Sequence, residues 1–284
     1  MSVARGLFAG PGACRALRDG ACGEVELRVS GGAYVRLGSA EWLLLARPGA
    51  PFGPLSVAVA GFDQLALHPG APARVIRDRL VIGADGVTLE RVRERRAVPI
   101  GARPPRSADL PAMRRAAAAA HTRLPSPPAV LLPGLAALTV RRVREAVSLL
   151  AGLGEGLTPA GDDVLAGYAA AQVALATPVA LSPAAAGRSS ALGLAYLRCA
   201  ERGDLPEAGA RLLTAICRGS VTAAQVSASR LRSWGRTSGA ALGWGINAAV
   251  AQASAPLCRG ESSRSTPRKA RLGLESTGRG ADPP

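Results

Sequence analysis

A change in the spacing of apolar residues near Met113 constrains the fold of this 284-residue chain more than any other feature. Before this point the apolar runs are short, and Gly, Pro or Asp residues separate them; after it, long Ala-rich segments follow one another. Short runs bounded by turn residues are typical of β-strands, whereas long segments with helical period are typical of helices. The sequence therefore predicts an α+β fold, with a β-rich part followed by a helical bundle.

We expect the β-rich domain to occupy residues 1–105 and to form an antiparallel sheet or a small barrel, because no helical period separates its strands. The predicted strands are Val25–Val29, Ala33–Leu37, Trp42–Ala46, Leu55–Ala60, Ala73–Ile76, Leu80–Ile82 and Val87–Leu89. Gly83 to Gly86 is typical of a hairpin loop between the last two. The proline-rich segment Pro99–Pro111 predicts a linker to the next domain.

Residues 106–255 are expected to form the Ala-rich helical bundle, with five to seven helices. The predicted helices are Met113–Thr122, Val140–Leu150, Pro159–Ala176, Pro183–Glu201, Leu205–Arg218, Ala223–Trp234 and Gly239–Ala253. The uncharged run Val164–Leu181 contains Gln172 and Pro178, so it predicts a buried helix rather than a membrane span. Residues 256–284 lack any period and are rich in Gly, Ser, Arg and Pro, which predicts a disordered basic tail.

The net charge of +15 raises the question of a nucleic-acid partner. The excess is spread along the chain, almost all of it is arginine with Lys269 as the single lysine, and no DNA- or RNA-binding motif accompanies it. Binding of RNA or DNA is thus the least favoured of the interpretations that we carry. The five cysteines include no CxxC pair, and no secretory signal precedes them, so we expect a cytoplasmic protein with reduced thiols.

The most informative segment is the glycine-rich stretch from Gly152 to Asp163, GLGEGLTPAGDD. Glycines at alternate positions allow positive φ angles and a close approach of the backbone to a ligand or a neighbouring element. Thr158 and Pro159 are expected to be the N-cap and first residue of a helix that enters the core. A glycine loop at a helix N-terminus is typical of sites that bind phosphate or carboxylate through backbone N–H groups.

Asp162 and Asp163 add a requirement to this helix start. Adjacent helical residues diverge by about 100°, and the helix is apolar all round, so at least one carboxylate must point inward. A buried carboxylate needs a cation or several hydrogen-bond donors. The sequence leaves three partners open: Mg²⁺, an arginine, or the donors of Thr158 and the glycine loop.

Two further polar segments could complete a site. Gly235 to Gly239 is a turn that opens another apolar helix, where the hydroxyls of Thr237 and Ser238 and the charge of Arg236 could hold an oxyanion. Arg188 precedes two serines and could complement the aspartates. Ordinary helix capping and a solvent-exposed arginine are the respective alternatives.

Taken together, these residues resemble a known family. Gly152 to Asp163 with the following Leu165, Ala166 and Gly167 is similar to the GxGxGLTPxGDDxLxG signature of the AllH-like family, and the segments at Arg188 and Gly235 lie where that family has later polar helix starts. We expect the similarity to extend from about Arg5 to Ala253. The resemblance implies a subunit of an oxamate carbamoyltransferase, an assembly of three different subunits that exchanges a carbamoyl group between phosphate and oxamate in anaerobic purine (allantoin) breakdown.

The leading hypothesis is a transferase subunit that binds a small carboxylate or carbamoyl phosphate at the helix N-terminus and forms a hetero-oligomer. The hypothesis assigns catalytic roles to Asp162, Asp163 and Arg236, metal binding to Asp162 and Asp163, and substrate binding to Gly154, Gly156, Thr158, Thr237, Ser238 and Arg188. The alternative is a non-catalytic scaffold, whose glycine loop packs against a partner subunit of a metabolic complex.

Overall fold

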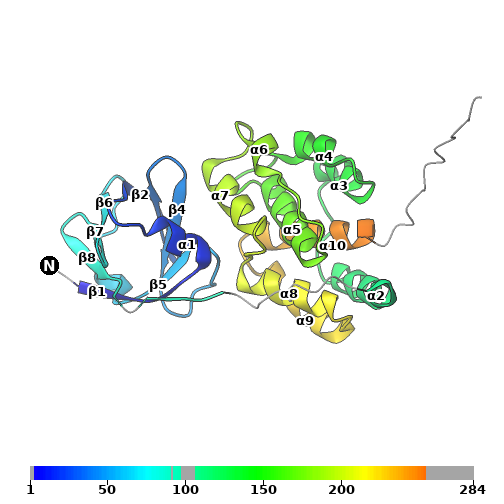
Figure 1. Cartoon of the computed structure of the whole chain (residues 1–284), viewed down its shortest axis with the longest axis horizontal. Coiled ribbons are helices and arrows are strands. Elements are labelled where there is room, and N and C mark those ends of the chain that lie inside the picture. Colours follow the sequence, from blue (N-terminus) through cyan, green and yellow to red (C-terminus); the bar gives the residue numbers. More distant parts are fainter. Residues whose placement is uncertain (1–2, 91, 97–105, 254–284) are drawn as a thin grey trace, which may run out of the picture.

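A computed structural model describes residues 3–90, 92–96 and 106–253. Figure 1 shows a β-barrel and a helical domain lying side by side. The strands of the described residues are β1 (Val3–Ala9), β2 (Cys22–Val29), β3 (Gly32–Leu37), β4 (Glu41–Ala46), β5 (Ser56–Ala60), β6 (Pro72–Ile76), β7 (Arg79–Ile82), β8 (Asp85–Thr88) and β9 (Arg93–Glu94). The chain is thus α+β, as the sequence predicts.

The strands close into a barrel because β1 pairs with both β5 and β8. Around the ring the order is β1, β5, β4, β3, β2, β6, β7 and β8, and β9 extends the sheet beside β1. The pairs β1–β8, β4–β5 and β1–β9 are parallel, whereas the other pairs of the described strands are antiparallel. The prediction of a small barrel is correct, and the prediction of an antiparallel sheet is wrong at these pairs.

Alternation along β3 and β4 separates the barrel core from the surface that faces the helices. Val35, Leu43 and Leu45 are fully buried inside the barrel. Tyr34 and Leu44 point to the opposite face, since successive side chains of a strand alternate, and both line a cavity against the helical domain. The seven predicted strands are present, but the prediction missed β1, β9 and the short helix α1 (Pro11–Ala16).

The helical domain contains the helices α2 (Leu110–His121), α3 (Leu132–Thr139), α4 (Val143–Leu150), α5 (Ala160–Ala174), α6 (Ser182–Ala185), α7 (Ala191–Ala200), α8 (Glu207–Cys217), α9 (Val221–Arg232) and α10 (Ser238–Ala253). The predicted segments Met113–Thr122 and Val140–Leu150 are α2 and α4, but the prediction missed α3 and joined α6 to α7. The expected five to seven helices are therefore too few. Most of α5 is buried, and no helix among the described residues is long and apolar enough to cross a membrane.

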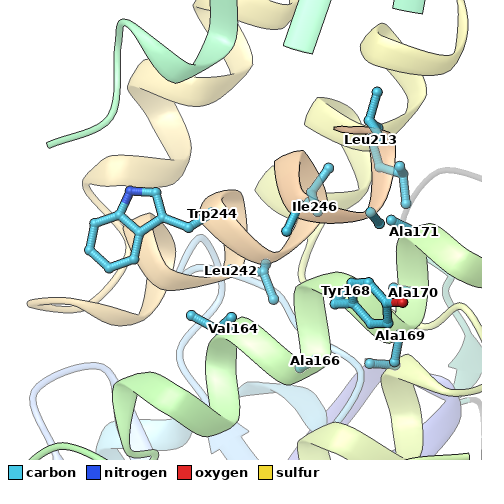
Figure 2. Close-up of a cluster of buried hydrophobic side chains, with 14 of the residues drawn as sticks. Val164, Ala166, Tyr168, Ala169, Ala170, Ala171, Leu213, Leu242, Trp244 and Ile246 are labelled. Carbon is cyan, nitrogen blue, oxygen red and sulfur yellow. The ribbon is translucent and has the colours of Figure 1, made fainter. Parts of the chain in front are cut away.

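Helices α5 and α10 cross at the centre of this domain (Figure 2). A Cβ atom on Gly167 would lie 2.1 Å from the carbonyl oxygen of Leu242, and one on Gly245 would lie 2.0 Å from that of Val164. The two backbones therefore touch directly, which only glycine permits at these positions. This close crossing places the N-termini of α5 and α10 beside one another.

The expected tail at residues 256–284 and the larger part of the expected linker lie outside the described residues. Both remain predictions.

Candidate functional site

A cavity of about 330 Å³ lies between the barrel and the helical domain. The barrel contributes the β2–β3 turn, outward side chains of β3 and β4, and the segment before β5. The helical domain contributes α5, α7, the start of α10 and the loops before α5, α8 and α10. Its polar lining residues are Ser30, Tyr34, Thr158, Asp163, Tyr196, Asp204 and Ser238.

The glycine loop adopts the backbone conformation that the sequence predicts. Gly152, Gly154 and Gly156 have φ angles of 75°, 118° and 97°. A Cβ atom on Gly152 would lie 2.0 Å from the carbonyl oxygen of Arg188, so this glycine is required for packing as well as for its φ angle. Gly154 and Gly156 are exposed and do not line the cavity.

Thr158 does not cap the helix as expected. The N-cap of α5 is Pro159, with an extended ψ of 141°, and the helix begins at Ala160. Thr158 instead lines the cavity, where its Oγ1 lies 3.2 Å from the Oγ of Ser238 in the first turn of α10. This contact links the starts of the two crossing helices.

Asp162 is held by protein groups on the side of α5 that faces α7. Its Oδ1 accepts hydrogen bonds of 2.8 Å from the backbone N–H of Gly152 and from the hydroxyl of Ser189. A Cβ atom on Gly193 would lie 2.2 Å from its Oδ2, so α7 covers this second oxygen, which has no hydrogen-bond partner among the described residues. Of the three kinds of partner left open by the sequence, the glycine-loop amide is the one seen here, and Asp162 does not line the cavity.

Asp163 faces the cavity and is only 8% exposed. Its Oδ2 has no hydrogen-bond partner among the described residues. Burial raises the pKa of this carboxyl to about 8, although the nearby hydroxyls of Ser238 and Thr158 act in the opposite direction. At pH 7 the group is therefore mainly a neutral acid, which can donate a hydrogen bond as well as accept one.

Sequence reasoning missed a pair of tyrosines beside Asp163. The hydroxyls of Tyr34 from β3 and Tyr196 from α7 lie 3.3 Å apart and join the two domains. Burial raises the pKa of both phenols, and the charge of Asp163 adds to this effect. The chain has three tyrosines in all, and their rarity in so Ala-rich a sequence was a signal that could have been followed.

Asp204 was also missed, and it lies at the same interface. Its carboxylate is 3.6 Å from the guanidinium of Arg15, which comes from α1 of the barrel domain. The guanidinium of Arg15 also donates a 3.5 Å hydrogen bond to the sulfur of Cys199. Burial raises the pKa of Asp204, while Arg96 and Arg15 act to lower it. No arginine or lysine is among the described residues that line the cavity.

The structure places the remaining predicted residues outside the cavity. Arg188, Arg236 and Thr237 are exposed, whereas Ser238 lines the cavity. No group of three or more His, Cys, Asp or Glu side chains suited to a metal ion occurs among the described residues. Binding of Mg²⁺ by Asp162 and Asp163 stays a prediction.

The comparisons with known proteins yield one family. Residues 150–250 match the family model described as oxamate carbamoyltransferase subunit AllH. No curated protein and no solved structure matches the chain. The match is narrower than the expected range of Arg5 to Ala253, because it begins at the end of α4 and leaves out the barrel. The matched residues carry the glycine loop, both aspartates and the start of α10, and the match supports an AllH-like assignment for this part of the helical domain.

Proposed function

We propose that this chain is a subunit of an oxamate carbamoyltransferase-like complex and that its interdomain cavity binds oxamate. The observation that carries the proposal is Asp163, which lines the cavity and whose buried Oδ2 has no hydrogen-bond partner among the described residues. With its pKa raised to about 8, this carboxyl would act as a neutral acid at pH 7. A carboxylic acid and a primary amide complement each other: the acid O–H donates to the amide carbonyl, and an amide N–H donates to the acid carbonyl. The amide end of oxamate therefore fits Asp163.

The carboxylate end of oxamate finds hydroxyl donors in the same cavity. Thr158 and Ser238 lie at the starts of α5 and α10, where the helix dipoles favour negative charge. The phenols of Tyr34 and Tyr196 are further neutral donors. Together these groups would hold a monoanion without a cationic side chain.

The proposed reaction transfers the carbamoyl group from oxalurate to phosphate, giving oxamate and carbamoyl phosphate, or runs in reverse, so phosphate is the second substrate. Its higher charge calls for arginine or lysine, which are absent from the described lining of the cavity. We therefore propose that oxamate binds to this subunit and that phosphate binds to a partner subunit. Carbamoyl transfer between them would depend on positioning and charge stabilisation.

The test is thermal stabilisation of the chain by oxamate and, separately, by carbamoyl phosphate. We expect oxamate to raise the Tm and carbamoyl phosphate alone to have little effect. Asp163→Leu, which keeps the branched arrangement of side-chain heavy atoms and removes both polar oxygens, should abolish the response, and Arg236→Ala is the control at an exposed position outside the cavity. An unchanged oxamate response in Asp163→Leu would refute the proposal.

The protonation state of Asp163 gives the proposal a pH signature. Its carboxyl loses the donor proton above its pKa of about 8, so oxamate affinity should fall above this pH by up to about tenfold per pH unit. Asp163→Asn keeps an amide donor at every pH and should make the affinity independent of pH. Equal pH profiles of the two proteins would remove Asp163 from the site.

Mg²⁺ is tested in the same assay. If Asp162 and Asp163 hold the ion, Mg²⁺ should raise the Tm of the wild type, and the double variant Asp162→Asn with Asp163→Asn should lose this effect.

The four described cysteines are free thiols, which fits the proposed cytoplasmic location.

A second candidate function is a non-catalytic, partner-binding subunit. Val130, Leu132 and Val140 lie around α3 and are 58%, 49% and 62% exposed. Exposed apolar side chains that lie close together often mark protein interfaces. A scaffold should co-purify with the other transferase subunits yet show no Tm response to oxamate or carbamoyl phosphate.

A further inference from the structure

The cavity is apolar away from its hydrogen-bonding residues. The apolar side chains that line it include Leu44, Leu157, Leu205, Trp234 and Leu242. They come from both domains. Oxamate has only two carbon atoms, both bonded to polar atoms, so it would leave these walls without an apolar partner.

The cavity is also large for a ligand as small as oxamate. Its volume of about 330 Å³ lies within the range of roughly 300–1,000 Å³ that is typical of sites for drug-sized ligands. Binding sites of this size combine apolar walls with a few polar groups that fix the orientation of the ligand. The arrangement around Asp163 fits that description.

Leu157 provides an independent observation at the edge of the cavity. Its side chain lines the cavity and is 45% exposed. The hydroxyl of Ser190 donates a 2.7 Å hydrogen bond to the carbonyl oxygen of Leu157, which fixes the backbone at this point. An apolar group bound in the cavity would cover this leucine and gain from its burial.

Charge limits what such a ligand can carry. Asp163 and Asp204 line the cavity, whereas none of its described lining residues is an arginine or lysine. Arg15 forms its ion pair with Asp204 from outside the lining. The cavity wall therefore offers no opposite charge to a negative group on the ligand, so each added negative group would weaken binding.

We propose that the cavity accepts a carboxamide or ureido compound with an apolar substituent, whose polar head contacts Asp163 and whose substituent packs against Leu157, Leu205, Trp234 and Leu242. This inference rests on the proposed function for the position of the head and extends it to the substrate class. Oxamate shares the carboxamide head of this class but has no apolar substituent, so it would leave the apolar walls uncovered.

The experiment is isothermal titration calorimetry of the full chain with n-alkylureas from methylurea to hexylurea, with oxamate measured in parallel. Each buried methylene should raise the affinity about fourfold until the cavity is filled. Leu157→Ser should reduce the gain per methylene. Leu149→Ser is the matched control, because Leu149 is a similarly exposed leucine on α4 that does not line the cavity.

The outcomes separate this inference from the proposed function. Affinity that does not change with chain length, or a gain that Leu157→Ser leaves intact, would overturn the inference even if oxamate binds. A rising series without oxamate binding would support the apolar site and refute the assignment of oxamate as its ligand.

Discussion

The two sides of the α5 N-terminus differ although adjacent residues supply their carboxyl groups. On the closed side, Asp162 is bound by Gly152 and Ser189 and covered by α7. On the cavity side, Asp163 keeps an unpartnered oxygen beside Ser238. The Oδ2 atoms of both aspartates are buried and without a hydrogen-bond partner among the described residues, but only Asp163 lines the cavity. A pair of aspartates in a signature is therefore no evidence of a shared role.

The largest expected effect comes from removing the carboxyl group on the closed side. Asp162→Ala should leave the N–H of Gly152 and the hydroxyl of Ser189 without an acceptor, and lower the free energy of unfolding by about 2–5 kcal/mol. Urea denaturation measures this loss. Asp162→Asn retains an acceptor oxygen and should cost less. A loss below about 1 kcal/mol in Asp162→Ala would contradict a structural role.

Asp163→Asn should raise the free energy of unfolding, whereas Asp162→Ala lowers it. The pKa of Asp163 is raised from 3.8 to about 8 in the folded protein, so its contribution to stability is complete below pH 4 and is lost as the pH rises to 8. Asparagine carries no such charge, and the variant should gain about 1–3 kcal/mol over the wild type at pH 8. Thermal melts between pH 4 and 8 should show the gap widening; a constant gap would argue against a buried, ionisable Asp163.

A pair of serine variants compares the two sides directly. Ser189→Ala removes one donor to Asp162 and should cost about 1 kcal/mol of stability without changing oxamate affinity. Ser238→Ala should cost less stability but weaken oxamate binding about fivefold, the equivalent of one lost hydrogen bond. Urea denaturation and calorimetry separate the two effects, and reversed results would mean that the sides have been assigned wrongly.

The smallest effect is expected from the arginines. Arg188 and Arg236 are exposed, so Arg188→Ala and Arg236→Ala should each change stability by less than about 0.5 kcal/mol. Their Tm response to oxamate should equal that of the wild type. Loss of the response in Arg236→Ala would restore the catalytic role that the sequence hypothesis gives this residue.

Much of the fold could be predicted because it depends on local patterns. Alternation and turn residues located the strands from Val25 to Leu89, and the helical period located most of the bundle. Barrel closure could not be read in this way, since it depends on the pairing of Val3–Ala9 with two strands distant in the chain. The parallel pairs β1–β8 and β1–β9 were missed for the same reason, because their strands are also distant in the chain.

The candidate site was predicted in part. The glycine loop and the two aspartates drew attention because backbone freedom and buried charge have local signatures. Tyr34, Tyr196 and Asp204 come from separate elements and have no common pattern in sequence. Only the packing of the barrel against the helices brings them to one cavity.

The sequence by itself determined that the chain has a β-rich part and an Ala-rich helical part, and that two carboxyl groups stand at the start of a buried helix. The tertiary structure decided which of them is held by the protein and which faces a cavity. The reason is physical: periodicity and composition act over a few neighbouring residues, whereas the environment of a carboxyl group depends on which distant segments pack around it.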